Sequence, residues 1–302
     1  MTSRIHGVVT AMITPFADNG RELNKDISTE YLEFLIDKGV NGVFVGGTTG
    51  EGLLLSVEER ISLFSAVAGK VKNRISVIAH VGDVSTDNAV ELAKRAQDIG
   101  IKTISAVLPY FYPLDEKAIF KYFENIAKSV PEISVYAYNI PGNTVNNLSA
   151  ELFRRLISEI ENFVGVKTSS PDFFLLKDYL YAGDDNCDVL VGCDGLDFPG
   201  LICGAKGLIS GNSSAFPEPF VRLYNAVMAG KIDEGKRIQK CIDELRAITH
   251  DGKYLSMFKL GLSMRGIPVG NIRGALRELT NKEEEKFKEA INRWATKWEI
   301  EI

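Results

Sequence analysis

Short apolar runs alternate with longer segments of helical spacing along most of the chain. The apolar runs are continuous rather than interrupted by polar residues, which is typical of strands buried on both faces of a parallel sheet. Eight runs precede residue 220, and they cover residues 7–14, 42–47, 75–81, 103–109, 133–139, 163–167, 188–192 and 206–211. Eight strands, each followed by a helix, within about 225 residues match the size of a (β/α)₈ barrel. The sequence therefore predicts an α/β fold, a TIM barrel.

Several of the segments between these runs carry helix boundary signals. One begins at Ser28, which is expected to cap the helix, and ends at Gly39. Another begins with Ser56, three residues before Glu59, which is the spacing of a capping box. A third ends at Gly100, and glycine is common just past the end of a helix. These signals place helices between the predicted strands.

The last part of the chain has helical spacing throughout. We therefore expect a barrel over residues 1–220 that carries the active site, and C-terminal helices over residues 221–302 packed on the barrel. A doubly wound open sheet is the structural alternative, and it would carry a glycine-rich phosphate turn after an early strand. The glycines of residues 42–52 lack the spacing of such a turn, which favours the barrel.

The composition is typical of a globular protein and argues against nucleic acid or a membrane as a partner. Of the 302 residues, 45% are hydrophobic and 25% are charged, and the net charge is −5 without a basic stripe for nucleic acid. No apolar stretch approaches the ~18 residues that span a bilayer, and the first residues lack a signal-peptide cleavage site. No C-x-x-C pair occurs, so we expect free thiols and a cytoplasmic location. The cysteines are Cys187, Cys193, Cys203 and Cys241.

Polar residues follow the predicted strands at the points where the strands end. In a barrel, these C-terminal ends form the rim on which active sites lie. The candidates in chain order are Gly47, Thr48, Thr49, Tyr138, Lys167, Asp194, Ser210, Gly211 and Asn212. We expect them to meet at one rim and to form the site for a small-molecule substrate.

The segment GGTTGE, residues 46–51, admits two interpretations. It could be a tight turn, in which glycines take positive φ and the threonines cap the next helix. It could also be a nest of backbone N–H groups that binds a carboxylate together with two hydroxyls. Two adjacent threonines favour the second interpretation.

Three other candidates also have structural alternatives. Tyr138 is either a core tyrosine or, one strand from Lys167, a proton shuttle. His80 has no second histidine near it in sequence, so a hydrogen-bonded residue below the rim is favoured over a metal ligand. Asp194 could cap the helix that follows it or hold a substrate hydroxyl.

Lys167 ends the apolar run FVGVK, where an ordinary lysine would extend its amine to water. A lysine amine becomes a nucleophile when desolvation lowers its pKa. A neutral amine attacks a ketone to form an imine, and the protonated imine withdraws electrons from the adjacent carbon. That is the chemistry of aldol cleavage and condensation, and it is our hypothesis for Lys167.

Three motifs together resemble one known family: GGTTGEG at residues 46–52, YNIP at 138–141 and GVKTSS at 165–170. They are similar to motifs of the dihydrodipicolinate synthase and N-acetylneuraminate lyase family, and the resemblance extends from residue 7 to about residue 219. Members of this family are (β/α)₈ class I aldolases that form a Schiff base with pyruvate. The resemblance implies Lys167 as the imine lysine and Tyr138 as the acid/base. It also implies that Thr48 and Thr49 hold the pyruvate carboxylate.

Two positions at which this sequence differs from the family motifs argue against particular substrates. Dihydrodipicolinate synthases carry an arginine shortly after the YN-x-P motif, and here that place is Asn143. Neuraminate lyases usually carry an acidic residue after the seventh-strand aspartate, and here it is Gly195. The segment at residues 209–218 is similar to 2-keto-3-deoxygluconate aldolases.

We therefore expect reversible cleavage of a 2-keto-3-deoxy sugar acid to pyruvate and an aldehyde. N-acetylneuraminate lyase is the main alternative. Dihydrodipicolinate synthase, a keto-deoxy sugar acid dehydratase and a non-catalytic 2-keto acid sensor are further alternatives.

The resemblance also implies a homotetramer. Dihydrodipicolinate synthases use a tyrosine lent by a neighbouring subunit, and in LPYFYP its place is taken by Phe111, between Tyr110 and Tyr112. Because aromatic residues are enriched at buried interfaces, we expect these three at a subunit contact. No metal and no cofactor are expected, because the imine itself accepts the electrons.

Overall fold

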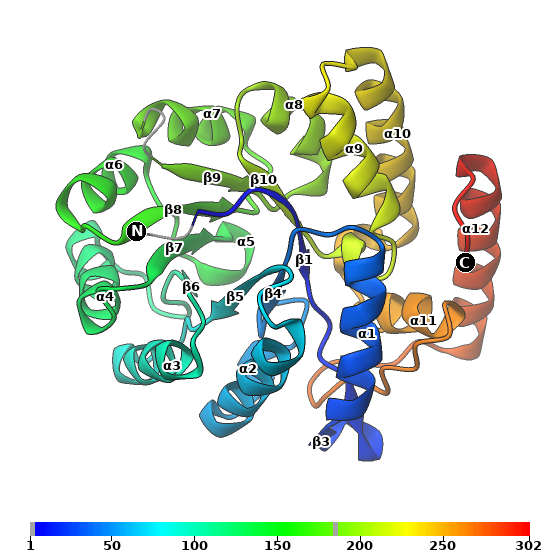
Figure 1. Cartoon of the computed structure of the whole chain (residues 1–302), viewed down its shortest axis with the longest axis horizontal. Coiled ribbons are helices and arrows are strands. Elements are labelled where there is room, and N and C mark those ends of the chain that lie inside the picture. Colours follow the sequence, from blue (N-terminus) through cyan, green and yellow to red (C-terminus); the bar gives the residue numbers. More distant parts are fainter. Residues whose placement is uncertain (1–3, 184–186) are drawn as a thin grey trace.

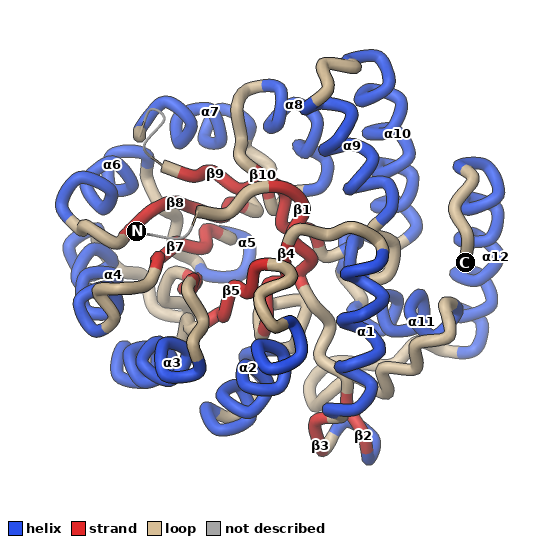
Figure 2. The backbone as a smooth tube through the Cα atoms, viewed as in Figure 1, coloured by secondary structure: helices blue, strands red, loops and turns tan. Residues whose placement is uncertain are grey.

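The computed structural model describes residues 4–183 and 187–302. Within these ranges a closed barrel is formed by parallel strands in the order β1-β10-β9-β8-β7-β6-β5-β4 (Figures 1 and 2). The strands are β1 (Gly7–Ala11), β4 (Gly42–Val45), β5 (Ser76–His80), β6 (Thr103–Val107), β7 (Ser134–Asn139), β8 (Phe163–Thr168), β9 (Asp188–Val191) and β10 (Gly207–Ser210). Each overlaps a run that the sequence predicts, with only Thr168 of β8 lying outside its run, so the (β/α)₈ fold is confirmed.

Helices surround the barrel and connect its strands (Figure 1). They are α1 (Lys25–Asp37), α2 (Val57–Val71), α3 (Thr86–Ile99), α4 (Glu116–Ser129), α6 (Ala150–Glu159), α7 (Phe173–Ala182), α8 (Asp197–Ile202) and α9 (Glu218–Met228). A short helix, α5 (Pro141–Thr144), follows β7, and a small hairpin of β2 (Phe16–Ala17) and β3 (Glu22–Leu23) precedes α1.

Local capping explains where the helices begin. The prediction that Ser28 caps the first helix is wrong, because α1 begins one turn earlier and the Asn24 side chain accepts a hydrogen bond from the Ile27 N–H at 3.2 Å. Asparagine caps a helix as well as serine does. Asn24 therefore replaces Ser28 as the cap, and the helix includes the residues between them. The capping box of Ser56 and Glu59 is confirmed, with N–H to side-chain distances of 3.2 and 2.9 Å.

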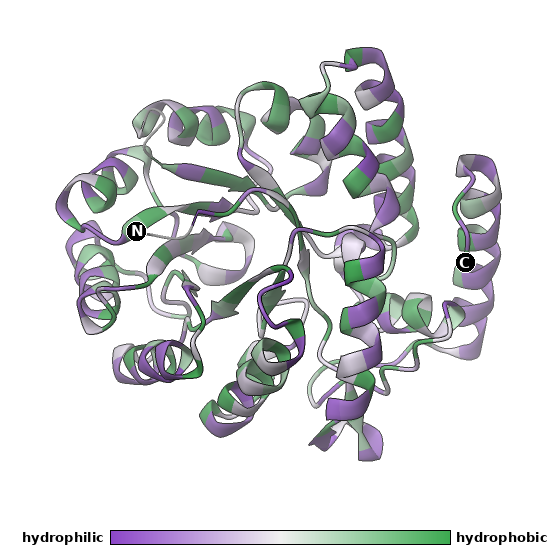
Figure 3. Cartoon of the chain, in the orientation of Figure 1, coloured by the Kyte–Doolittle hydropathy of each residue, from purple (hydrophilic) through white to green (hydrophobic). Residues whose placement is uncertain are grey.

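Apolar residues are buried on both faces of the barrel, as the continuous runs predict. One cluster fills the barrel interior and includes Val9, Phe44 and Ile78. A second, larger cluster lies between the strands and the outer helices. Figure 3 shows hydrophobic residues on the strands and on the inner sides of the helices, and hydrophilic residues on their outer sides. This packing holds the strand ends rigidly, which is what a site on the rim requires.

Three further helices follow the barrel: α10 (Ile232–Ile248), α11 (Leu255–Met264) and α12 (Asn281–Trp298). Helix α12 packs on α10, where the Trp294 indole N–H donates to the Cys241 carbonyl at 3.0 Å. The division into two parts stays a prediction, and its boundary at residue 220 falls inside α9. Among the described residues, no helix combines the length and the apolar character needed to cross a membrane.

Candidate active site

Lys167 lies at the rim end of β8 and does not extend into water. Only 4% of the residue is exposed. Strand register pairs it with Tyr138 on β7, and its Nζ lies 3.9 Å from the centre of the Tyr138 ring. The ring of Phe44, at the rim end of β4, is 4.5 Å away on another side. The amine is therefore enclosed by aromatic faces that hold it near the barrel axis.

The Tyr138 hydroxyl belongs to a polar group that continues to the second strand. It lies 3.4 Å from Oγ1 of Thr48. Burial by itself would raise the pKa of Tyr138, but the nearby charge of Lys167 and hydrogen bonds with Thr48 and Ser169 bring the pKa below its ordinary value. A phenol whose ionised form is stabilised in this way can accept and return a proton beside the amine.

The GGTTGE segment forms a compact loop directly after β4. The N–H of Glu51 donates to the Thr48 carbonyl at 3.1 Å, and the N–H of Gly52 donates to Gly47 at 3.0 Å. A Cβ on Gly52 would collide with the backbone of Gly46, so the turn requires glycine there. Thr48 is exposed at the loop surface. The structure thus contains the tight turn. It also leaves the Thr48 side chain exposed, as the carboxylate-binding interpretation of this segment requires.

Asp194 belongs to a hydrogen-bonded network at the ends of β9 and β10. Its carboxylate accepts hydrogen bonds from Ser210 Oγ and Asn212 Nδ2, both at 2.8 Å. Asn212 in turn accepts from Thr249 Oγ1 at 2.7 Å. Burial raises the pKa of Asp194, while these two donors counteract the rise. Both hydrogen bonds to the Asp194 carboxylate come from side chains, whereas a capping residue accepts backbone N–H groups.

Thr49 and Gly211 connect the loop after β4 with this network. Thr49 Oγ1 lies 3.1 Å from the position that a Cβ on Gly211 would occupy. The residues predicted at the ends of the second, fifth, sixth, seventh and eighth strands therefore lie on one rim of the barrel.

His80 lies below the rim and is fully hydrogen-bonded. Its Nδ1 lies 3.1 Å from the Gly46 carbonyl, and its Nε2 accepts the N–H of Val107 at 3.3 Å. Burial holds the pKa of His80 well below its ordinary value, and the charges of Arg60 and Lys167 lower it further. The ring is therefore neutral and supports the loop at Gly46. In the described parts of the chain, no three His, Cys, Asp or Glu side chains are grouped to hold a metal.

Two contacts near Lys167 were not predicted. Ser169 Oγ donates to the Gly192 carbonyl at 3.1 Å, and Ser169 also interacts with Tyr138. A Cβ on Gly192 would lie 2.9 Å from Cε of Lys167 and 2.5 Å from Ser169 Oγ. The space beside the amine thus depends on a glycine at the end of β9. Two features of the sequence point to these contacts: the hydroxyl residues that follow Lys167, and the glycine that follows the seventh strand.

Gly195 is covered by a cation from the C-terminal helices. A Cβ at this position would collide with the guanidinium of Arg246, which extends from α10. Arg246 also pairs with Asp251 at 2.8 Å and with Asp243 at 3.2 Å. The place next to Asp194 is therefore occupied by Arg246 instead of a side chain of residue 195.

The aromatic segment before α4 is largely exposed in the single chain. Phe111 is 76% exposed and Tyr112 is 62% exposed, and their rings meet edge to face at 5.0 Å. Phe111 has φ of +75°, an unfavourable conformation for an aromatic residue. The subunit contact predicted for Tyr110, Phe111 and Tyr112 stays a prediction.

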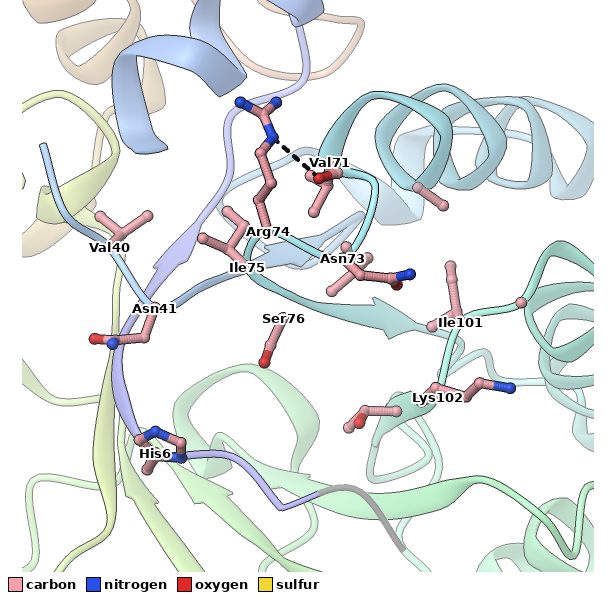
Figure 4. Close-up of a pocket in the computed structure, with 14 residues that line it drawn as sticks. His6, Val40, Asn41, Val71, Asn73, Arg74, Ile75, Ser76, Ile101 and Lys102 are labelled. Atoms are coloured by element: carbon pink, nitrogen blue, oxygen red, sulfur yellow. Dashed lines mark hydrogen bonds between the residues drawn. The ribbon is translucent and has the colours of Figure 1, made fainter. Parts of the chain in front are cut away.

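The opposite end of the barrel carries a pocket of about 420 Å³ (Figure 4). His6, Asn41, Ser76 and Lys102, which line it, all lie at or just before the N-terminal ends of strands. Residues at that end of a TIM barrel contribute to stability rather than chemistry. The pocket therefore lies apart from the site around Lys167.

Comparison with known proteins covers nearly the whole chain. A model of the dihydrodipicolinate synthetase family matches residues 4–294. An uncharacterized DapA-like lyase from Halobacterium salinarum is 36% identical over 275 residues, which cover 91% of this chain and 89% of that protein. A 4-hydroxy-tetrahydrodipicolinate synthase from Methanococcus maripaludis is 31% identical over 290 residues, which cover 95% and 98%.

Solved structures are similar in fold over the same extent. CdNal from Clostridium difficile, in complex with mannosamine, superposes with a TM-score of 0.91 at 29% identity. The superposition covers 97% of this chain and 100% of that chain. It includes the C-terminal helices as well as the barrel, so the likeness is not confined to the common barrel scaffold.

Proposed function

Because the chain belongs to the dihydrodipicolinate synthetase family, whose members are Schiff-base lyases, we propose that it cleaves a 2-keto-3-deoxy sugar acid. The substrate is of the 2-keto-3-deoxygluconate type, and the products are pyruvate and an aldehyde. The observation that carries the proposal is the buried amine of Lys167 at 3.9 Å from the Tyr138 ring, on the rim of the barrel. A nucleophile and an acid/base group are thereby brought together where substrates reach a TIM barrel.

In the proposed mechanism, Lys167 Nζ attacks the C2 ketone of the substrate, and the carbinolamine takes up a proton and loses water to give an iminium. The C4 hydroxyl gives its proton to the Tyr138 phenolate, and the C3–C4 bond breaks. The electron pair of that bond moves toward the iminium and forms an enamine, while C4 leaves as the aldehyde. Tyr138 then returns the proton to C3, and water hydrolyses the resulting pyruvate imine. Condensation is the reverse of these steps.

The substrate carboxylate is proposed to bind in the loop after β4. Thr48 and Thr49 supply hydroxyl groups there, and the backbone from Gly47 onward supplies N–H groups. Thr48 lies 3.4 Å from the Tyr138 hydroxyl, so a carboxylate held by this loop is next to the acid/base group. A 2-keto acid places its ketone one bond from its carboxylate, which matches an amine beside the tyrosine that the loop contacts.

The hydroxyl groups of the substrate tail are proposed to meet Asp194, Ser210, Gly211 and Asn212. The network of Asp194 with Ser210 and Asn212 supplies both acceptors and donors. Arg246 fills the space beside Gly195, which favours a shorter tail than that of a sialic acid. Asn143 stands where the synthases of this family carry an arginine, which disfavours a substrate with a second carboxylate.

N-acetylneuraminate lyase is the second candidate, and one observation favours it. The solved structure of CdNal, which superposes at a TM-score of 0.91, was determined in complex with mannosamine. The proposed mechanism is the same for either substrate, so only the tail contacts distinguish them. We also propose a cytoplasmic homotetramer, by family resemblance, with the Phe111 segment at a subunit contact.

The test is a panel of keto acids assayed for release of pyruvate with a coupled dehydrogenase. The panel contains 2-keto-3-deoxygluconate, its C4 epimer and N-acetylneuraminate, and a separate condensation assay contains pyruvate and aspartate semialdehyde. We expect the highest kcat/KM for a 2-keto-3-deoxy sugar acid. Faster turnover of N-acetylneuraminate would establish the second candidate, and no turnover of any of them would favour the sensor.

A chelation control accompanies the panel. Because the iminium accepts the electrons in this mechanism, activity is expected to survive exhaustive treatment with a chelator. Loss of activity with recovery on adding a divalent ion would contradict the Schiff-base mechanism.

A further inference from the structure

Glu51 closes the GGTTGE loop, and its side chain is buried instead of exposed at the loop surface. The carboxylate is buried and forms an ion pair with Nζ of Lys259 on α11 at 2.7 Å. The exposed fractions of the two side chains are 0% and 5%. The loop proposed to bind the substrate carboxylate is thus connected directly to the C-terminal helices.

Further contacts enclose the pair. The second carboxylate oxygen of Glu51 accepts the backbone N–H of Arg273 at 2.6 Å. Lys259 donates to the Asn271 carbonyl at 2.6 Å and lies 4.4 Å from the centre of the Phe16 ring. The segment after α11 therefore wraps the ion pair and excludes water from it.

The backbone of Glu51 shows why the ion pair affects the loop. Glu51 has φ of +55° and ψ of +26°, in the left-handed region where residues other than glycine are strained. Its N–H holds the Thr48 carbonyl at 3.1 Å, so the conformation at Glu51 sets the position of Thr48. The contacts of the Glu51 side chain are the restraints that keep this strained conformation in place.

Charge gives a second reason for the ion pair. A carboxylate at Glu51 without a partner would repel a substrate carboxylate bound three residues away, and the repulsion would be strong in a dry environment. Lys259 neutralises Glu51 in a buried ion pair. Buried ion pairs add little net stability compared with apolar residues, so stability alone does not account for this one.

We propose that Lys259 is a positioning residue for the carboxylate-binding loop. Through Glu51 it holds Thr48 and Thr49 in place and removes a repulsive charge, so the C-terminal helices take part in recognition of the 2-keto acid. This inference rests on the proposed function, because it concerns the loop that would bind the substrate carboxylate.

The experiment measures trapping of the pyruvate imine by borohydride, followed by mass spectrometry, over a range of pyruvate concentrations. Methyl pyruvate, which has the ketone but no carboxylate charge, is the matched probe. Lys259→Met should raise the half-saturating concentration of pyruvate by about tenfold or more, as expected for loss of one charge-assisted contact. The half-saturating concentration of methyl pyruvate should change less than about twofold, since it does not depend on the loop charge.

The matched control is Arg265→Met. Arg265 directly follows the same helix α11, and its guanidinium forms a mostly buried ion pair with Glu218 on α9 instead of with a residue of the loop. This variant should lose thermal stability but keep the wild-type half-saturating concentrations for both probes. If Lys259→Met does not fold, Lys259→Gln keeps a polar side chain beside Glu51 and removes the positive charge. It should raise the value for pyruvate more than the value for methyl pyruvate.

The outcomes separate this inference from the proposed function. A wild-type protein that is not labelled by pyruvate and borohydride would refute the proposed function and the inference together. A labelled wild type, with a folded Lys259 variant that keeps its half-saturating concentration for pyruvate, would refute the inference alone. An equal rise for pyruvate and methyl pyruvate would also refute it, because the ion pair would then support the fold without regard to the carboxylate.

Discussion

Lys167 and Lys259 are equally buried, with 4% of each residue exposed, and both ammonium groups lie against aromatic rings. They differ in their polar partners. Lys259 pairs with Glu51 at 2.7 Å and donates to the Asn271 carbonyl. No ion pair joins Lys167 to an acid in residues 4–183 and 187–302, and its amine interacts with the ring and hydroxyl of Tyr138.

The comparison shows that burial of an amine does not by itself indicate chemistry. Burial lowers the pKa of Lys259, against the opposing effect of Glu51, and its amine is held in the ion pair with Glu51. Lys167 lies at the rim end of a strand, beside a phenol whose pKa is below its ordinary value. A neighbouring group that can take protons and a place at the rim end of a strand distinguish the lysine that we expect to react.

The largest expected effect tests this distinction directly. Pyruvate and borohydride should add one reduced pyruvate to the wild-type protein, and peptide mapping should place the added mass on Lys167. Lys167→Arg should abolish both labelling and turnover, because arginine keeps the charge but forms no imine. Label on Lys259, or full activity of Lys167→Arg, would overturn the comparison.

Tyr138→Phe should have the next largest effect. The change removes the hydroxyl and keeps the ring against Lys167, so the fold should be unaffected. General acid–base catalysis contributes about 10²- to 10⁴-fold in rate, and kcat should fall by about that factor. Steady-state kinetics and circular dichroism measure the two properties. A kcat within about twofold of wild type would mean that Tyr138 is only a core residue.

Gly192→Ala tests whether the open space beside Lys167 matters. The added methyl would lie 2.9 Å from Cε of Lys167 and 2.5 Å from Ser169 Oγ, so the amine must shift. Displacement of a reacting group by 1 Å can reduce the rate by about 10²-fold, and we expect a reduction of roughly tenfold to a hundredfold in imine formation. Single-turnover trapping measures that rate.

The control is Gly142→Ala, where an added Cβ meets no atom within 4 Å. It should keep the wild-type rate of imine formation. Equal rates in both glycine variants would show that the amine is not constrained by its surroundings.

Much of the fold and part of the site follow from local sequence. The continuous apolar runs predict strands buried on both faces, and positions directly after those strands identify Lys167, Tyr138 and Thr48 as rim residues. The helix start at Ser28 was wrong because two capping residues lie close together and local sequence does not rank them.

The partners of these residues could not be predicted in the same way. Lys259 lies within an amphipathic helix and is far from Glu51 in sequence, so no local pattern connects them. The role of Gly192 depends on the neighbouring strand β8, and a single glycine in sequence does not reveal which side chain needs its space. Contacts between distant segments appear only when the topology is known.

Thr48→Val is expected to have the smallest effect of these changes and concerns how the Tyr138 phenol is tuned. Thr48 Oγ1 lies 3.4 Å from the Tyr138 hydroxyl, and this hydrogen bond helps to lower the pKa of Tyr138. Valine removes the donor, so the pKa of Tyr138 should rise. Because the phenolate takes the substrate proton, kcat should increase with pH through the pKa of Tyr138. That rise should therefore move to higher pH in the variant.

A pH profile of kcat for cleavage measures this shift, and Thr49→Val is the matched control. Thr49 places its hydroxyl against Gly211 instead of Tyr138, so its removal should weaken carboxylate binding and raise KM without moving the profile. If both variants move the profile equally, the loop acts on Tyr138 through general electrostatics rather than through the Thr48 hydrogen bond. If neither moves it, the Tyr138 phenol is tuned by Lys167 and Ser169 alone, and the loop has no part in proton transfer.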